Sequence, residues 1–371
     1  RVGVRPEVED LHVLETGAII PGASVRLANP VTGYANTVAT SPEGRFQFTN
    51  IPFQTYTLSI EKPGFTAVAE SLSLRSNIPV EREIRLPLAG QGTAIDVTAT
   101  ELQATIDTEA TGPRTELDAA TFARLPSQAS GRGIESVLLS FPGFAANANG
   151  AIHPRGAHNQ MTYVIDGMPI SDQLTGAFAN AVDPTIVQNI ELFTGDVPAE
   201  YGNKVSGVAN ITTRTGMGTG RKAAGSTQLY AAGFDTLAQI TQVQGGTEKF
   251  GYFASVNTLK SNRFLDSVSL DNLHNGGNSE RAFTRFDYQP NSRDTFRLNL
   301  MGGRSSFQLA NLRSQHANGQ QQRQLLRDAS VSLGWVRTID ARSTFDATAS
   351  YRTSIARSEE RRVGKECRSR W

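Results

Sequence analysis

The sequence predicts a mainly β protein in three successive parts: a small β-sandwich, an α+β region, and a set of long antiparallel strands. Two observations support this prediction. Apolar residues alternate with polar residues along the first and last parts of the 371-residue chain, as they do in strands with one buried face. Turn residues, including many of the 34 glycines, separate these alternating segments at short intervals.

Composition excludes several classes of protein. Charged residues make up 19% of the chain and the formal net charge is only +1, which excludes a disordered chain and argues against nucleic acid as the partner. No stretch reaches the ~18 apolar residues of a membrane-spanning helix, although strands that cross a membrane escape this test. The tail 357–371 breaks the patterning before it and is similar to a sequencing adapter translated in frame. It contains the only cysteine, Cys367, so we expect neither disulfides nor thiolate metal sites.

The first part reads as a run of short strands at a spacing near ten residues, which is typical of a small β-sandwich. The alternating apolar residues are Ala23, Val25, Leu27, Phe46, Phe48, Tyr56, Leu58, Ile60, Ile84, Leu86 and Leu88. The segments TGAIIPGASVRLANPVTG, SPEGRFQFTNIPFQTYTLSIEKPGF and REIRLPL resemble the carboxypeptidase regulatory-like domain. The resemblance implies a transthyretin-like sandwich without catalytic activity, which we place at 1–90.

The middle part mixes helix and strand signals. Asp118 precedes a helix-like stretch over 119–125, and a second stretch covers 133–139. Strands are expected over 162–165, 190–194 and 208–213. Asp166-Gly167 is a tight-turn signal that lets the chain reverse after the first of these strands.

The middle part also carries a specific family resemblance. LPSQASGRGIESVLLSFPGF, IHPRGAHNQMTYVIDGMPI and QNIELFTGDVPAEYGNKVSGVANITTRTG resemble the plug domain of TonB-dependent outer-membrane receptors, placed here at 101–216. The motif residues that match are Arg155, Gly156, Asp166, Gly167, Glu200, Tyr201, Gly202 and Gly207. Arg155 and Glu200 are interpreted either as members of structural ion pairs or as part of a release mechanism.

A short extended segment lies in the linker 91–100. In the family that the plug resembles, such a segment before the plug is the box that the periplasmic TonB-type energy-coupling protein grasps. The matching residues are Ile95, Asp96, Val97, Thr98 and Ala99. A strand that adds to the edge of a partner's sheet binds largely through its backbone, which suits this sequence. The alternative is an interdomain linker strand.

The third part, 217–356, predicts long antiparallel strands with one apolar and one polar face. Because side chains alternate, we expect one set to face outward: Phe296, Leu298, Leu300, Val331, Leu333, Phe345, Ala347 and Ala349. The set facing the plug or the lumen is Arg297, Asn299, Ser330, Ser332, Asp346 and Ser350.

Connections in this part alternate between short and long, as in an outer-membrane β-barrel. The short ones are expected at 245–248, 290–293 and 339–341, and the long ones at 262–280 and 307–326. Tyr288, Trp335 and Tyr351 are expected to form an aromatic girdle near the strand ends. About seven strands are expected, against ~22 in plugged outer-membrane transporters, so this part predicts the first strands of an incomplete barrel.

Other chemistry is not supported by the sequence. His12 and Glu15 have the spacing of two zinc ligands, but no third ligand or base is identifiable, so we expect no metal, no cofactor and no enzyme. The resemblance implies an outer-membrane receptor in contact with lipid, with a periplasmic N-terminal domain, that imports a scarce extracellular ligand such as a siderophore, glycan or peptide. The alternative function is a secreted or surface β-rich binding or adhesion protein without transport.

Overall fold

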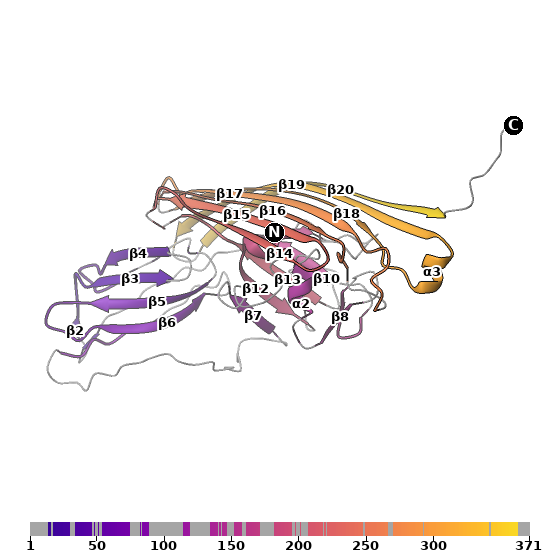
Figure 1. The fold of residues 1–371 in the computed structure, drawn as a ribbon. Coiled ribbons are helices and arrows are strands. Elements are labelled where there is room, and N and C mark those ends of the chain that lie inside the picture. The colour runs from indigo at the N-terminus through magenta and orange to yellow at the C-terminus, as the bar shows by residue number, and fades with distance from the viewer. Residues whose placement is uncertain are drawn as a thin grey trace.

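The computed structural model contains three main β-sheets that follow one another along the chain. It describes residues 14–15, 18–29, 34–46, 48, 51, 54–74, 82, 84–88, 114–118, 134–139, 141, 143–146, 152–157, 161–170, 182–194, 197, 201, 207–217, 219, 221–247, 249–265, 270–291, 293–340 and 343–362. In Figure 1 the seven-stranded sheet arches over the middle sheet, and the N-terminal sheet lies to one side. Among the described residues, no helix has the length and apolar character needed to cross a membrane.

The N-terminal sheet has four antiparallel strands in the order β4-β3-β5-β6, after a two-stranded hairpin of β1 and β2. The strands are β1 (Leu14–Glu15), β2 (Ala18–Ile19), β3 (Ser24–Asn29), β4 (Tyr34–Ala39), β5 (Gln54–Glu61) and β6 (Val68–Leu74). Their apolar face is covered by buried side chains from outside the sheet: Phe46, Phe48, Ile51, Ile84 and Leu86. The predicted β-sandwich core is therefore confirmed.

Two details of the sandwich prediction were wrong. The alternating residues at 46–48 and 84–88 lie outside the named strands, and the described pairing there is limited to isolated bridges such as that between Leu88 and Phe65. Strands β4 and β6 were not predicted. β4 is an edge strand whose described side chains are mostly exposed, so it has little apolar alternation.

The middle sheet has five strands in the order β11-β10-β13-β12-β7. They are β7 (Arg114–Asp118), β10 (Met161–Ile165), β11 (Met168–Ile170), β12 (Val187–Phe193) and β13 (Gly207–Thr213). The pair β10 and β13 is parallel, and the other pairs are antiparallel. The predicted strands are all present, with ends shifted by a few residues.

Short elements complete the middle region. They are α2 (Ile134–Leu138), η2 (Pro184–Ile186) and the hairpin of β8 (Phe144–Ala146) and β9 (Ile152–Pro154). The predicted helix over 133–139 is confirmed as α2. Asp118, predicted to precede a helix, instead ends β7, where its backbone pairs with Asn189. The helix expected over 119–125 lies outside the described residues.

The third sheet has seven strands, and each pairs antiparallel with the next along the chain. They are β14 (Ala224–Ala232), β15 (Thr236–Gly246), β16 (Phe250–Ser261), β17 (Gly277–Tyr288), β18 (Asp294–Gln308), β19 (Gln320–Asp340) and β20 (Ser343–Arg362). The predicted number of strands is confirmed. β20 extends into the tail 357–371, where Arg357–Arg362 pair with β19. α3 (Arg313–Ala317) lies between β18 and β19.

The long connections are shorter than predicted, because the strands continue through polar residues. They cover 262–276 and 309–319, instead of 262–280 and 307–326. Ser279, for example, pairs directly with Ser305 in the ladder between β17 and β18. Polar residues at these positions resemble a loop sequence, so the hydrophobic pattern of the sequence does not show that the strands continue.

The two faces of this sheet differ as predicted. On the outer face Leu300, Val331, Leu333 and Phe345 are exposed, whereas Asn299, Ser330 and Ser332 on the inner face are buried. Aromatic rings contact one another across neighbouring strands near one end of the sheet, in the order Tyr288, Phe296, Trp335 and Phe345. Tyr288 and Trp335 therefore lie where the girdle was predicted. Tyr351 does not, because it pairs with Val331 in the middle of β20.

Candidate functional site

The centre of the candidate site is the turn between β10 and β11. Asp166 and Gly167 form a two-residue connection, with φ angles of 47° and 87° respectively. Both angles are left-handed, which suits the type of turn that joins twisted antiparallel strands and favours Asp-Gly. The predicted tight turn is confirmed. It presents the Asp166 side chain to the inner face of the seven-stranded sheet.

The Asp166 carboxylate is buried, with 1% of its side chain exposed, and it is hydrogen-bonded from two sides. From the middle sheet, the backbone N–H and the hydroxyl of Thr213 donate to it at 3.1 and 2.6 Å. From β18, Asn299 Nδ2 donates to Oδ2 at 2.7 Å. Arg297 Nη2 donates to the Asp166 backbone carbonyl at 2.7 Å. The turn is thus bound both to its own sheet and to the facing strands.

Arg285 of β17 contacts both its own strand and the middle sheet. Its Nε and Nη2 donate to the two oxygens of Asp287 at 2.8 and 2.9 Å, a bidentate pair within one strand. Its Nη1 donates to the carbonyl oxygen of Thr213 at 2.9 Å and lies 3.5 Å from Asp166 Oδ1. Two guanidinium groups thus face two carboxylates, which balances the buried charge. We call Asp166, Thr213, Arg285, Asp287, Arg297 and Asn299 the polar latch.

The latch determines the ionisation of Asp166. Burial alone raises the pKa of a carboxyl, because it penalises the charged form. Here the charges of Arg285 and Arg297 and the hydrogen bonds from Thr213 outweigh burial, and they lower the pKa of Asp166 from 3.8 to about 2. Asp166 is therefore ionised at neutral pH. In its buried position it needs the charges of the facing arginines to stay ionised.

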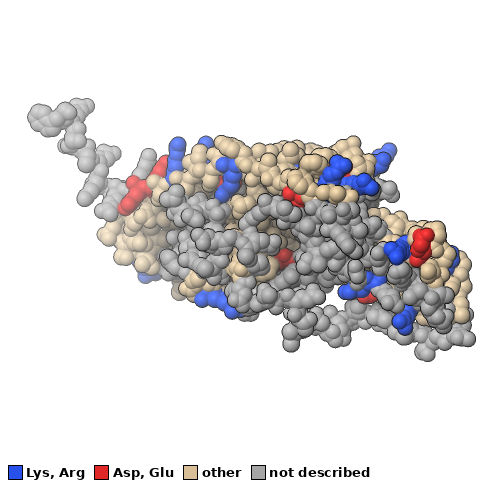
Figure 2. All heavy atoms as spheres, turned by 180° about the vertical axis from the view of Figure 1, so that it is seen from behind, with Lys and Arg blue, Asp and Glu red and all other residues tan. Residues whose placement is uncertain are grey.

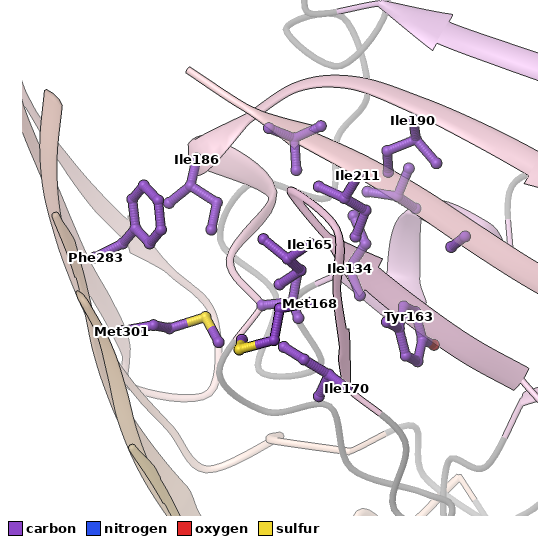
Figure 3. Packing of buried hydrophobic residues seen from close by; sticks show 14 of the residues in the cluster. Ile134, Tyr163, Ile165, Met168, Ile170, Ile186, Ile190, Ile211, Phe283 and Met301 are labelled. Atoms are coloured by element: carbon purple, nitrogen blue, oxygen red, sulfur yellow. The ribbon is translucent and has the colours of Figure 1, made fainter. Parts of the chain in front are cut away.

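Apolar packing lies beside the latch. Phe253, Phe283 and Met301 project from the seven-stranded sheet into the core cluster of the middle region. Figure 3 shows Phe283 and Met301 directed toward Ile186, Ile165 and Met168. Two polar contacts lie on the same side: Thr185 and Ser255 hydroxyls are 3.2 Å apart, and Gln242 Nε2 donates to the Thr185 carbonyl at 3.0 Å.

Of the predicted motif residues that the structure describes, Asp166 and Gly167 alone belong to this site. Arg155 and Gly156 form an exposed turn after β9, with φ angles of 47° and 79°. Gly207 begins β13 and is buried, and a Cβ there would lie 2.9 Å from Met161 Sδ. The Tyr201 ring lies 5.5 Å from that of Phe193.

The other predicted site residues are not described. Glu200, Gly202 and the box residues Ile95, Asp96, Val97, Thr98 and Ala99 lie outside the described residues. No group of three or more metal-ligating side chains was found in the part of the chain that the structure describes.

Sequence reasoning missed part of the latch. It placed Arg297 and Asn299 on the inner face, which the structure confirms, but it assigned no role to Arg285, Asp287 or Thr213. One signal was available. Arg285 and Asp287 occupy alternate positions of a strand whose other face is apolar, and ionisable groups at such positions are a hypothesis of function by default.

Two domain descriptions match the chain. Residues 13–87 match the carboxypeptidase regulatory-like domain, and residues 108–209 match the TonB-dependent receptor plug domain. Both resemblances seen in the sequence are confirmed, as is the mainly β fold class. Seen from behind, charged side chains of the described residues form small separate groups (Figure 2).

Whole-protein comparisons agree with the domain matches. The TonB-dependent transporter Oar of Myxococcus xanthus is 27% identical over 192 residues, which cover 48% of this chain and 17% of Oar. The copper transporter OprC has a TM-score of 0.53 at 13% identity, covering 66% of this chain and 37% of its own. The alcaligin outer-membrane receptor FauA of Bordetella pertussis has a TM-score of 0.53 at 10% identity, covering 68% and 40%. This chain therefore spans less than half the length of these proteins.

Proposed function

We propose that this chain is part of a TonB-dependent outer-membrane receptor, which binds a scarce extracellular ligand and releases it inward when a TonB-type partner pulls on the plug. Receptors and transporters of this family are not enzymes. The middle sheet serves as the plug, and the seven-stranded sheet forms part of the surrounding barrel wall. Residues 95–99 serve as the box that the partner grasps. The observation that carries the proposal is the polar latch.

The latch suits a contact that must hold at rest and yield under force. Its bonds across the interface join the turn at Asp166 and the end of β13 at Thr213 to two neighbouring strands, β17 and β18. A hydrogen bond to a charged group contributes ~1.5–3 kcal/mol, and a few such bonds can break without unfolding either sheet. When the turn withdraws, Asp166 keeps its bonds to Thr213 and Arg285 keeps its pair with Asp287. Arg285 therefore keeps a charged partner, and the Asp166 carboxylate keeps two hydrogen-bond donors from Thr213.

The outer face of the seven-stranded sheet supports a place in a lipid bilayer. Its apolar positions form a band between the aromatic ring of Trp335 at one edge and the charged side chain of Arg327 at the other. Along β19 these two residues are eight positions apart. At ~3.4 Å per residue this band is at most ~27 Å tall, close to the ~25 Å of outer-membrane barrels. Arg304 and Glu280 pair at 3.5 Å beyond the band, with side chains about half exposed.

The box is tested by substituting Val97 with proline in the complete receptor. Proline removes a backbone donor that the partner's sheet needs for strand addition. We expect Val97→Pro to abolish uptake while ligand binding stays nearly unchanged. Val97→Ala is the matched control, because it keeps the backbone donor and should keep uptake.

Binding and uptake are measured on the same cells, with outer-membrane levels checked by immunoblot. Equal loss of binding and uptake would indicate a folding defect instead of lost coupling. Full uptake by the proline variant would show that these residues are only an interdomain linker.

A further inference from the structure

We propose that the inner face of β17, β18 and β19 carries a covered binding patch for an uncharged, hydroxyl-bearing part of the ligand, formed by Ser279, Ser305, Gln324 and Asp328. This inner-wall patch lies beyond the polar latch, toward the long connections of the sheet. The proposal rests on the proposed function and adds to it the chemistry of the ligand.

The patch is a group of buried polar atoms without partners. Ser279 and Ser305 are 1% and 0% exposed and pair directly across β17 and β18. The hydroxyls of both, the Gln324 Oε1 and the Asp328 Oδ1 are buried and find no hydrogen-bond partner among the described residues. Buried polar groups are nearly always hydrogen-bonded, so four such atoms on adjacent strands require an explanation. A ligand that supplies the missing hydrogen bonds is one.

Register places these residues together on the inner face. Ser305 lies opposite Leu326, and Asp328 lies opposite Gly303, so Ser305 and Asp328 are diagonal neighbours across β18 and β19. Gly303, which has no side chain, lies between Arg281 and Asp328 in the same cross-strand row. Diagonal neighbours in a sheet are close enough for one small ligand group to reach both.

The charge of the patch favours a neutral ligand group. Asp328 Oδ2 already accepts from Arg352 Nε at 2.8 Å, so its charge is paired. A cation therefore gains no net attraction here. The free atoms include an amide oxygen and a carboxylate oxygen, which need donors, and hydroxyl groups supply donors without charge.

Two apolar side chains from the connection after β16 lie beside the patch and close it. We call Phe264 and Leu265 the apolar cover. The Phe264 ring stacks on Phe307 with centroids 5.1 Å apart. Gly277 lies beneath both rings, and a Cβ there would meet Phe264 Cγ and Phe307 Cβ at 2.6 Å. Ser279 follows on the same face of β17, so the cover borders the patch.

Besides this apolar packing, polar contacts hold the cover in place. The Asn275 side chain clamps Leu265 through its N–H at 2.9 Å and its carbonyl at 2.7 Å. Farther out, Arg313 of α3 pairs with Asp271 at 2.5 and 2.6 Å, and the Arg313 side chain is 81% exposed. This pair ties the two long connections together. Exposed ion pairs of this kind are weak and respond to salt.

The test uses Ser305→Cys as a reporter in the complete receptor, with Cys367→Ser removing the other cysteine of this chain. Its rate of modification by a small neutral methanethiosulfonate measures access to the patch. We expect slow modification while the cover is closed. Gly277→Ala, which displaces Phe264, and Arg313→Ala, which releases the tie, should each raise the rate about tenfold. Gly302→Ala is the matched control, because its nearest heavy atom is 3.8 Å away.

Ligand chemistry is tested on the Arg313→Ala background with glucose, glucosamine and gluconate as probes. Protection of the cysteine by glucose, with less protection by the two charged probes, supports the proposal. Protection by a charged probe alone overturns the chemical class. No protection by any probe, or no change of rate when the cover is released, overturns the site. None of these measurements involves the energy-coupling partner, so they fail independently of the proposed transport function.

Discussion

The two faces of the seven-stranded sheet use the same strands for opposite purposes. On β18, Leu298 and Leu300 face outward, while Arg297 and Asn299 reach the plug turn at 2.7 Å. On β19, Val331 and Leu333 are exposed, while Ser330 and Ser332 are buried. The outer face is suited to lipid, and its aromatic rings contact one another across neighbouring strands. The inner face holds the plug by a few directed bonds that can be broken singly.

The largest effect is expected at the inner face, from Arg285→Ala. This change leaves the carboxylates of Asp287 and Asp166 buried without their shared guanidinium. Removing one member of a buried ion pair costs about 3–5 kcal/mol, so the free energy of unfolding should fall by that amount. Urea titration of the complete receptor in detergent measures it. A loss below ~1 kcal/mol would mean that the latch does not hold the plug.

On the outer face, Leu333→Arg should cost about 2–4 kcal/mol if the position lies near the bilayer midplane. The reason is the transfer of a charge into hydrocarbon, not the loss of a contact. Leu333→Ala is the matched control for lost side-chain volume and should cost much less. Refolding equilibria in lipid vesicles give both values. Equal costs would place Leu333 at the interface or in a soluble fold.

The stability that the inner face contributes should also fall in acid. The pKa of Asp166 is lowered from 3.8 to about 2 in the folded protein. The unfolded state therefore binds its proton first as pH falls, and the stabilisation is complete above about pH 4 and lost between about pH 4 and 2. The shift of roughly 2 units corresponds to about 2 kcal/mol. Asp166→Asn should flatten this part of the stability profile. An unchanged profile would contradict the assigned role of Asp166.

The smallest effect is expected for the exposed pair of Arg304 and Glu280. Their side chains are both 47% exposed, and the nitrogen and oxygen are 3.5 Å apart. Such pairs contribute ~0–1 kcal/mol, so Arg304→Ala should change the unfolding free energy by no more than that. Thermal melting in detergent checks it. A larger loss would show that the charged level beyond the apolar band is structurally important.

Much of the fold could be predicted because alternation survives wherever one face of a strand is buried. Leu298, Leu300, Val331 and Leu333 are examples, and so is the Asp166-Gly167 turn, whose backbone angles suit those residues. The edge strand β4 and the strand ends near Ser279 could not be predicted, because polar residues there pair through the backbone alone.

The latch was only partly predictable for a different reason. Periodicity assigns a residue to a face, and so it placed Arg297 and Asn299 correctly. It does not say which residue of another sheet lies opposite. Arg285 and Thr213 are 72 positions apart in sequence, and only the packing of the plug turn against β17 brings them within 2.9 Å.

The central claim, that Asp166 and the strands of the third sheet form one coupled contact, is tested most directly by a double-mutant cycle. The variants are Asp166→Ala, Asn299→Ala and the combination of both, and the quantity measured is the free energy of unfolding of the complete receptor. Because Asn299 Nδ2 donates to Asp166 Oδ2 at 2.7 Å, we predict a coupling energy of about 1–3 kcal/mol between the two positions. Additive effects, with no coupling beyond the error of the measurement, would contradict the account.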